Sequence, residues 1–349
     1  MGGRRENGEL SESGATPRTR RWSDGRDPRC AGPDDHDDTE CPLILGTRGA
    51  RRAGTVALTA GAVLVAGPLV VPAQAAAGPS GVAAKGAFLL DSGPNKALWG
   101  KSADTKRQMA STTKIMTAAV VLTTKGVDLN RKVTVKKAYR DYVAKNGAST
   151  ADLKTGDKLT VRQLLYGMML PSGCDAAYAL ADTYGSGSTT AARTKSFISK
   201  MNKKAADLGM KNTKFDSFDG ISKAGKNQST PRDLAKLARH AMANSTFKTV
   251  VKAPKTVQKA TNGRTYTWYN TNTLLGSYKG VVGIKTGTGT KAGPCLVFAA
   301  TRDKRTVVGV VLNSSKRYPD ATKMLDWAFK QKKASKVTLR RLPQDAQRD

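Results

Sequence analysis

The chain has 349 residues, enough for one or two domains, and its 59 Lys and Arg against 27 Asp and Glu give a formal net charge of +32. Nucleic-acid binding would be the usual explanation of such a charge. Aromatic residues make up only 6% of the chain and no nucleic-acid-binding motif is recognisable, so we predict no nucleic-acid partner.

The first 47 residues do not read as part of a folded domain. They are rich in Arg, Asp and Gly and have no hydrophobic periodicity, so we predict a disordered leader or a start codon assigned too early. The cluster at residues 34–38, four Asp around one His, could suggest a metal ligand set. A solvated charge run explains this cluster better, and we predict no metal site.

Residues 48–75 have the pattern of an export signal. Three arginines precede the apolar run 55–71, and the Ala-Gln-Ala sequence at 73–75 matches a small-residue cleavage site. The alternative is an uncleaved membrane anchor, but two glycines and a proline interrupt the run, which favours cleavage. We therefore predict a secreted, extracytoplasmic protein at the cell wall or the outer face of the cytoplasmic membrane.

An extracytoplasmic location limits what the positive charge can bind and which cysteines can form disulfides. Peripheral contact with anionic wall polymers or membrane lipids suits the charge, although a solvated lysine-rich surface without a partner is the competing interpretation. Cys30 and Cys41 fall in the leader, whereas Cys174 and Cys295 fall in the exported part. A disulfide between the last two is allowed by the compartment, but we predict two free thiols, with Cys295 in the core.

Residues 80–330 predict one domain, followed by a basic tail at 331–349 for which disorder is the expected state. Hydrophobic periodicity predicts helices and strands in the order strand, helix, strand along the domain. A sheet built from both ends of the chain, with helices on its faces, would follow, since short connections between the last strands imply antiparallel neighbours. The predicted strands are Ala84–Leu90, Ala97–Lys101, Gly280–Thr286, Cys295–Arg302 and Thr306–Asn313, and the predicted helices are Ser111–Thr123, Leu159–Leu170, Ala176–Tyr184, Ala191–Leu208, Pro231–Ala243 and Asp320–Phe329.

Three short motifs occur in one order along this domain. They are S-x-x-K at Ser111–Lys114, an S-x-N-like triplet at Ser172–Cys174, and K-T-G at Lys285–Gly287. Single matches are uninformative, because S-x-x-K recurs at Ser245–Lys248 and K-T-G recurs at Lys154–Gly156. The ordered set is typical of penicillin-binding proteins and class A β-lactamases.

The first motif can supply a nucleophile and its base. Positions i and i+3 of a helix share one face, so Lys114 should lie one turn beyond Ser111. A serine hydroxyl needs a base, and of the two histidines His36 falls in the leader while nothing places His240 near the serine. A buried lysine near other positive charge can lose its proton, and the helix N-terminus and Lys285 would provide that charge. The pattern predicts a Ser-Lys pair.

From Ala84 to Phe329 the chain resembles the serine D-alanyl-D-alanine peptidases, the low-molecular-mass penicillin-binding proteins. Supporting stretches outside the three motifs are Leu164–Gly173, Phe215–Gly220 and Ser229–Leu234. Within the family, the chain is most similar to small secreted members that also have Cys in the second motif. The resemblance implies an α/β fold of the β-lactamase and penicillin-binding-protein type, an antiparallel sheet flanked by helices plus an all-helical region.

The resemblance also implies catalytic roles. Ser111 would be acylated, Lys114 would carry protons in acylation and deacylation, and Ser172 would relay a proton to the leaving group. Cys174 takes the place of the Asn that most relatives have. A thiol is a weaker hydrogen-bond donor and acceptor than an amide, which bears on the strength of substrate anchoring and on the balance between hydrolysis and transfer.

The third motif is implied to bind substrate. Lys285 and Thr286 would hold the terminal carboxylate, and Gly287 would let the substrate backbone lie along its strand. The backbone N–H groups of Ser111 and Thr288 would form the oxyanion hole.

These features predict a serine-type D-Ala-D-Ala carboxypeptidase or transpeptidase. Its substrates would be peptidoglycan stem peptides ending in D-Ala-D-Ala, its inhibitors β-lactams, and it would act as a monomer without a cofactor. A β-lactamase would need a glutamate to activate water, and every Glu precedes Cys41. The alternative from another class is a catalytically weak wall- or polyanion-binding protein on the same fold.

Overall fold

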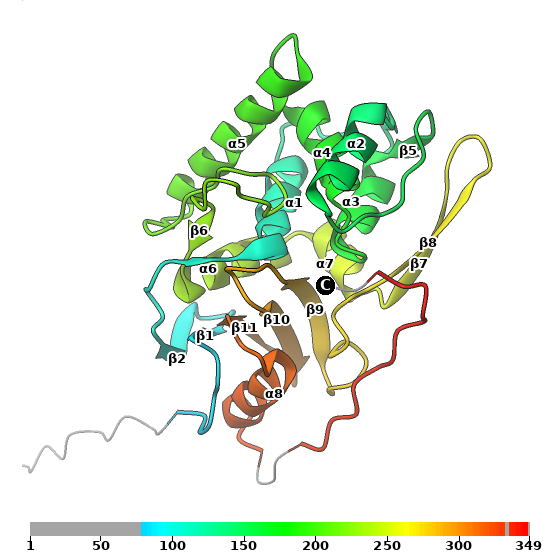
Figure 1. Ribbon diagram of the computed structural model, residues 1–349. Helices are drawn as coiled ribbons and strands as arrows, with labels where there is room; N and C mark the ends of the chain where they lie inside the picture. Colours follow the sequence, from blue (N-terminus) through cyan, green and yellow to red (C-terminus); the bar gives the residue numbers. More distant parts are fainter. Residues whose placement is uncertain (1–77, 332–334, 348–349) are drawn as a thin grey trace, which may run out of the picture. The chain divides into compact units, whose positions relative to one another are not determined.

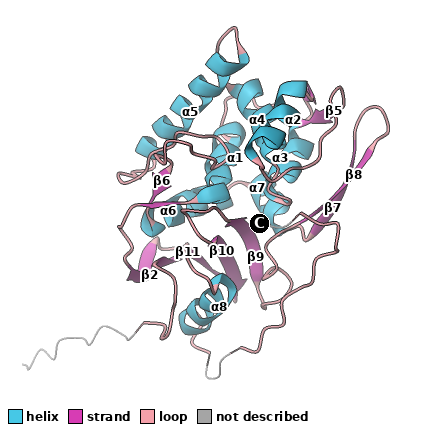
Figure 2. Ribbon diagram, in the orientation of Figure 1, coloured by secondary structure: helices cyan, strands magenta, loops and turns pink. Residues whose placement is uncertain are grey.

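The computed structural model of the protein describes residues 78–331 and 335–347. The predicted leader, at residues 1–47, and the predicted export signal, at residues 48–75, lie outside this part of the chain. Figure 1 follows the chain in sequence colours, and Figure 2 separates its helices from its strands.

A five-stranded sheet forms the lower half of the view in Figure 1. Its strand order is β2-β1-β11-β10-β9, and the four neighbouring pairs are antiparallel. The prediction of one sheet built from both chain ends is confirmed, because β1 pairs with β11. The strands are β1 (Gly86–Asp91), β2 (Lys96–Lys101), β9 (Val281–Gly287), β10 (Cys295–Arg302) and β11 (Arg305–Leu312).

Both faces of this sheet are buried, because successive side chains of a strand point to opposite faces. Phe88 and Val297 lie in the core that the helices α1, α6 and α7 share with the sheet. Their neighbours Leu89 and Phe298 lie in a second core beneath α8. The bounds of these helices are α1 Lys114–Leu122, α6 Pro231–Met242, α7 Ser245–Lys252 and α8 Arg317–Ala328.

The other helices gather beyond the sheet, in the upper half of Figure 2. All nine residues of α1 are buried, so this helix is the centre of the region, as its apolar sequence predicts. The sequence predicts that this region is all-helical, but the structure also has a short two-stranded β-ribbon in it. The members are α2 (Lys137–Asn146), α3 (Val161–Met169), α4 (Cys174–Tyr184), α5 (Thr190–Asp207), and the ribbon strands β4 (Lys132–Thr134) and β5 (Lys158–Thr160).

Two further two-stranded pairs complete the described chain. Strands β3 (Arg107–Gln108) and β6 (Gln228–Ser229) pair next to the start of the helical region. Strands β7 (Lys255–Lys259) and β8 (Thr265–Tyr269) form a hairpin that projects to the right in Figure 1.

The helix starts follow from local sequence. Thr160 forms a capping box with Gln163 at the start of α3. Thr230 caps α6, which has Pro231 in its first turn, where the missing N–H costs nothing. Helix α6 begins at the predicted residue, whereas α3 begins two residues after the predicted Leu159, which lies in β5. No helix among the described residues is long and apolar enough to span a membrane.

The expectation of a disordered tail is wrong for residues 335–347. The Ser335 hydroxyl donates to Asp326 at 2.6 Å, and the Arg340 guanidinium donates to the Asn270 carbonyl oxygen at 2.6 Å. Val337 and Leu339 pack against the second core. The basic composition of the tail suggests disorder, but Val337 and Leu339 alternate along it and give it apolar contacts with the domain.

Candidate active site

The candidate nucleophile lies on a tight turn that precedes α1. Residues Ala110–Thr113 form a single 3₁₀ turn, so the helix predicted to begin at Ser111 begins as 3₁₀ and becomes α-helical at Lys114. Ala110 has φ of 45°, a left-handed conformation that is rare for a residue with a side chain. Strained backbone of this kind concentrates at functional sites.

The Lys114 amine meets the Ser111 hydroxyl at 2.9 Å, within the range required of a general base. Its side chain is fully buried, and Nζ also donates to the Asp219 carbonyl oxygen at 3.0 Å and to the Cys174 sulfur at 3.3 Å. Nζ therefore makes three hydrogen-bond contacts, and those to Asp219 and Cys174 hold it beside the Ser111 hydroxyl.

The segment containing Asp219 is held tightly against the nucleophile turn. A Cβ at Gly220 would lie 2.1 Å from the Ala110 carbonyl oxygen, so only glycine permits this approach. The buried Asp219 carboxylate accepts from the Tyr142 hydroxyl at 2.9 Å. Burial, followed by the charge of Asp219, raises the pKa of Tyr142 well above its usual range, so this hydroxyl stays a donor.

The second motif contributes a buried serine without a hydrogen-bond partner. Among the described residues, the Ser172 hydroxyl has no partner, although its side chain is fully buried. Its backbone φ is 65°, again in the left-handed region, and its carbonyl oxygen accepts from Ser149 Oγ at 2.7 Å. A buried hydroxyl without a partner costs free energy, which indicates a position reserved for a ligand group.

Cys174 lies beside the amine as a neutral thiol. Its Sγ is 3.7 Å from the Ser149 hydroxyl as well as 3.3 Å from Lys114 Nζ. Burial raises the pKa of the Cys174 thiol to about 12, despite the opposing effect of the nearby Lys114. The prediction of a free thiol is confirmed for Cys174, and the predicted core position of Cys295 is confirmed by its complete burial.

The raised pKa of Cys174 predicts a loss of stability in alkali. The thiol ionises near pH 9.0 when unfolded and near pH 12 when folded, so its contribution is complete below pH 9.0 and disappears as the pH rises towards 12. We expect the free energy of unfolding to fall over this window, and to fall less steeply in Cys174→Ala. Urea titrations of wild type and Cys174→Ala at several pH values measure it. Equal slopes in Cys174→Ala and wild type would contradict the assignment.

The third motif lies at the end of strand β9, and hydrogen bonds connect it to the loop of the second motif. Lys285 is 1% exposed, and its Nζ donates to the Thr286 carbonyl oxygen at 2.9 Å. The Thr286 hydroxyl bonds to that of Thr271 at 2.6 Å. Thr271 N donates to the carbonyl oxygen of Leu170, two residues before Ser172. Threonine pairs therefore fix the strand against the loop of the second motif.

Gly287 brings the same strand against the nucleophile turn. A Cβ at this position would lie 2.9 Å from the Ser111 nitrogen and 3.0 Å from the Thr112 nitrogen. Because Ser111 is in the first turn of its helix, its N–H has no acceptor within that helix. Glycine thus leaves this N–H open beside the strand, as an oxyanion hole requires.

Arg317 adds a cation at the end of β9. Its Nη1 donates to the Thr288 hydroxyl at 2.9 Å, and the carbonyl oxygens of Gly287 and Cys295 lie 3.4 and 3.5 Å from the same atom. The sequence analysis did not single out Arg317, because it placed the start of α8 at Asp320. Proline favours the first turn of a helix, so Pro319, the third residue of the observed helix, is the signal that would have placed the start before Asp320.

The structure therefore gathers all three motifs around one serine. Ser111, Lys114 and Cys174 are in direct contact, and Gly287 abuts the turn of Ser111. Sequence reasoning did not assign a role to four contributors, of which only Asp219 lies in a stretch named for the resemblance: Tyr142, Ser149, Asp219 and Arg317. No group of His, Cys, Asp or Glu among the described residues could hold a metal ion.

The sequence matches the family model described as D-alanyl-D-alanine carboxypeptidase over residues 73–316. It is 56% identical over 288 residues to the D-alanyl-D-alanine carboxypeptidase of Streptomyces sp. strain K15, covering 80% of this chain and 98% of that protein. It is 35% identical over 247 residues to D-alanyl-D-alanine carboxypeptidase DacB2 of Mycobacterium tuberculosis, covering 69% of this chain and 79% of that protein.

Solved structures give the same result for the fold. The crystal structure of the Streptomyces K15 DD-transpeptidase superposes with a TM-score of 0.71 at 56% identity, covering 73% of this chain and all of that one. A penicillin-binding protein homologue from Mycobacterium tuberculosis superposes with a TM-score of 0.63 at 29% identity, covering 75% of this chain and all of that one. The predicted α/β fold with an antiparallel sheet and flanking helices is confirmed.

Proposed function

This chain belongs to the D-alanyl-D-alanine carboxypeptidase family of serine peptidases, and on that premise we propose that Ser111 is its nucleophile and Lys114 its general base. The contact that carries the proposal is the 2.9 Å distance between Lys114 Nζ and Ser111 Oγ. The chain is an enzyme of the carboxypeptidase and DD-transpeptidase type, and stem peptides of peptidoglycan are the substrates that this family implies.

Acylation follows from the hydrogen bonds of Lys114. Lys114 accepts the Ser111 proton while hydrogen bonds to the Asp219 carbonyl oxygen and the Cys174 sulfur keep Nζ in place. Ser111 Oγ then bonds to the carbonyl carbon of the penultimate D-Ala. The resulting oxyanion is stabilised by the N–H groups of Ser111 and Thr288.

Collapse of this tetrahedral intermediate expels the terminal D-Ala. The C–N bond breaks, and the amine leaves with the proton held by Lys114, which Ser172 passes on. The unpartnered hydroxyl of Ser172 supports this role, because it can accept from Lys114 and donate to the leaving amine without first breaking another bond. Water or an acceptor amine then attacks the acyl-enzyme, with Lys114 again taking the proton.

The terminal carboxylate of the substrate lies at the end of β9. Lys285, the Thr286 hydroxyl and the Thr288 hydroxyl are proposed to bind it, and Gly287 leaves room for the peptide along the strand. Arg317 supports the same site from α8 through its bond to Thr288. Carboxylates bind best to charged donors, since such hydrogen bonds are about twice as strong as neutral ones.

The composition of the domain makes the acyl-enzyme long-lived with β-lactams. No Glu follows Cys41, so the domain lacks the water-activating glutamate of a β-lactamase. The alternative of a catalytically weak wall-binding protein is not favoured, because the Ser-Lys pair is intact and the named relatives are enzymes.

We further propose that the enzyme is exported as a monomer and that export removes residues 1–75. The arginine-flanked apolar run ending at Ala73-Gln74-Ala75 motivates the boundary. N-terminal sequencing of the extracellular protein should begin at Ala76 or within a few residues of it. Recovery of the intact leader in the mature protein would contradict cleavage and favour an anchored form.

Release of D-Ala tests the proposed activity. The enzyme is incubated with a peptide ending in D-Ala-D-Ala, with and without an amine acceptor, and the products are separated by mass. We expect free D-Ala, together with a shortened peptide or an acceptor adduct, and neither product from Ser111→Ala. No release by folded wild type would refute the activity.

A further inference from the structure

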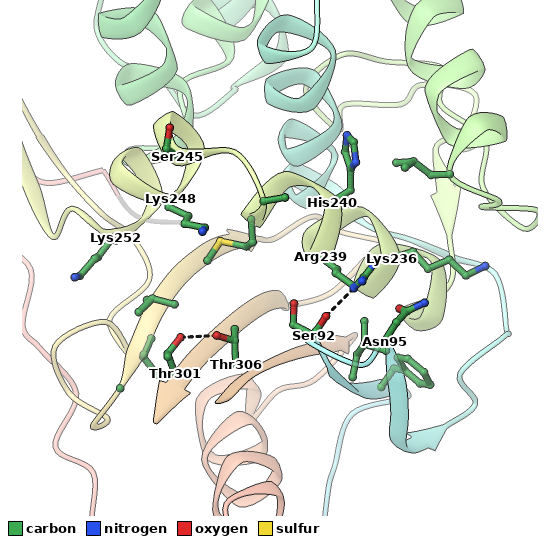
Figure 3. Close-up of a pocket in the computed structure, with 18 of the residues that line it drawn as sticks. Ser92, Asn95, Lys236, Arg239, His240, Ser245, Lys248, Lys252, Thr301 and Thr306 are labelled. Carbon is green, nitrogen blue, oxygen red and sulfur yellow. Dashed lines mark hydrogen bonds between the residues drawn. The ribbon is translucent and has the colours of Figure 1, made fainter. Parts of the chain in front are cut away.

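A long groove lies between helices α6 and α7 and one end of the sheet, as Figure 3 shows. Its strand side consists of residues of β1, of the turn after it and of β2, the end of β10, the start of β11, and the first residues of β9. Its volume of about 1410 Å³ exceeds the roughly 300–1,000 Å³ of most small-molecule pockets. None of its described lining residues belongs to the three motifs.

The groove has a strongly basic lining. Among the described residues that line it there is no acidic side chain. In Figure 3 the cations are spread along its length and do not converge on one point. They are Arg232, Lys236 and Arg239 from α6, and Lys248 and Lys252 from α7.

Three of these cations are partly engaged with neighbouring groups. Arg232 pairs with Asp104 at 2.7 Å, and Lys236 lies 3.2 Å from Asp233. Arg239 Nε donates to the Ser92 carbonyl oxygen at 2.8 Å, which fixes its guanidinium inside the groove. A guanidinium has five N–H donors, so a fixed Arg239 keeps donors for a ligand.

The two lysines of α7 are exposed and carry no ion pair within the described part of the chain. Lys248 and Lys252 are four residues apart on one helix, where like charges destabilise each other. Burial lowers the pKa of His240, and the nearby Lys204 lowers it further, which keeps this imidazole neutral. The charge of Lys248 and Lys252 is available to an anionic ligand.

The shape of the groove selects an extended ligand with an apolar backbone. Its lining includes the side chains of Phe88, Leu90 and Val281 between the strands and the cationic rim. We propose that this groove binds a linear phosphodiester polymer of the wall, with its phosphates on Arg239, Lys248 and Lys252 and its carbon chain along the apolar lining. Lys and Arg are the residues that bind phosphate, the first as a point charge and the second as a planar fork.

A membrane lipid fits these observations less well. An inserting surface needs exposed large hydrophobic side chains, and Val257 is the only one among the described residues. It lies in the β7–β8 hairpin and does not line the groove. The polymer would hold the enzyme at the start of β9, and the third motif lies at the other end of the strand, roughly 10–17 Å from Val282. This site does not depend on the proposed catalytic roles.

The test compares two double variants of the secreted chain. Lys248→Gln/Lys252→Gln removes two charges from the groove, and the control Lys132→Gln/Lys158→Gln removes two exposed lysines that form no ion pair on the β4–β5 ribbon. The probes are a fluorescent poly(glycerol phosphate) oligomer, inorganic phosphate, and vesicles with or without phosphatidylglycerol. Binding is measured at low ionic strength, and D-Ala release is measured with a soluble peptide.

We expect the groove variant to bind the oligomer about tenfold more weakly than wild type, and the control within about twofold. D-Ala release should be equal in all three proteins, and added salt should weaken wild-type binding. The proposal is overturned if the two double variants bind equally, or if inorganic phosphate binds as tightly as the oligomer. Groove-dependent binding to anionic vesicles without binding to the oligomer would assign the site to a lipid instead.

Discussion

Lys114→Met is expected to lower the acylation rate of Ser111 by about three to four orders of magnitude. The substitution removes the amine that lies 2.9 Å from Ser111 Oγ, and no histidine contact replaces it within the described residues. Met has a similar length and fills the same space, but it leaves the Asp219 carbonyl oxygen without its donor. The rate constant for acylation is therefore measured on the folded variant, with the melting temperature recorded beside it.

Lys114→Arg is the matched control for this prediction. It keeps the positive charge, but a guanidinium does not lose its proton in proteins and cannot act as the base. We expect an acylation rate as low as that of Lys114→Met. Stopped-flow measurement with a chromogenic β-lactam gives both rates. Substantial acylation by the Arg variant would show that Lys114 acts through its charge alone.

Lys285→Gln is expected to weaken acylation by a peptide ending in a free carboxylate by about a hundredfold. One or two charge-assisted hydrogen bonds, each worth roughly 1.5–3 kcal/mol, would be lost at the end of β9. The amide retains a donor near Thr286, where the wild-type amine is 2.9 Å from the carbonyl oxygen, so the local structure should persist. The readout is kcat/KM for D-Ala release.

Two comparisons separate carboxylate binding from a general effect of charge. A substrate whose C-terminus is amidated should be poor for wild type and no worse for Lys285→Gln. The control Lys291→Gln removes an exposed lysine from the loop that follows β9 and should act like wild type. If Lys285→Gln lost the same factor on the free and the amidated substrate, Lys285 would not be the carboxylate anchor.

Much of the sheet could be predicted because long apolar runs permit few alternatives. Strand β10 has the predicted bounds, Cys295–Arg302, and short turns on both sides enforce its antiparallel neighbours. Helix α2 was missed, since only Tyr139 and Val143 of its ten residues are buried. Strand β8 was missed although its buried residues alternate, because the hairpin that it completes projects from the body.

The contact between the nucleophile and its base could be predicted from helical spacing, but the residues around this pair could not. The i, i+3 spacing predicts the Ser111–Lys114 contact, and the structure has it. The bond from Ser149 to Ser172 and the approach of Asp219 to Lys114 join segments that only tertiary packing brings together. Their residue types also occur throughout the surface, so spacing alone gives no signal for them.

Intact-mass spectrometry after exposure to a labelled penicillin tests the central assignment most directly. Wild type should gain the mass of one penicillin, the adduct should persist because no glutamate speeds its hydrolysis, and peptide mapping should place it on Ser111. Ser111→Ala, which keeps Lys114 and both other motifs, should gain nothing. An adduct that persists in Ser111→Ala, or that maps to another residue, would contradict the account.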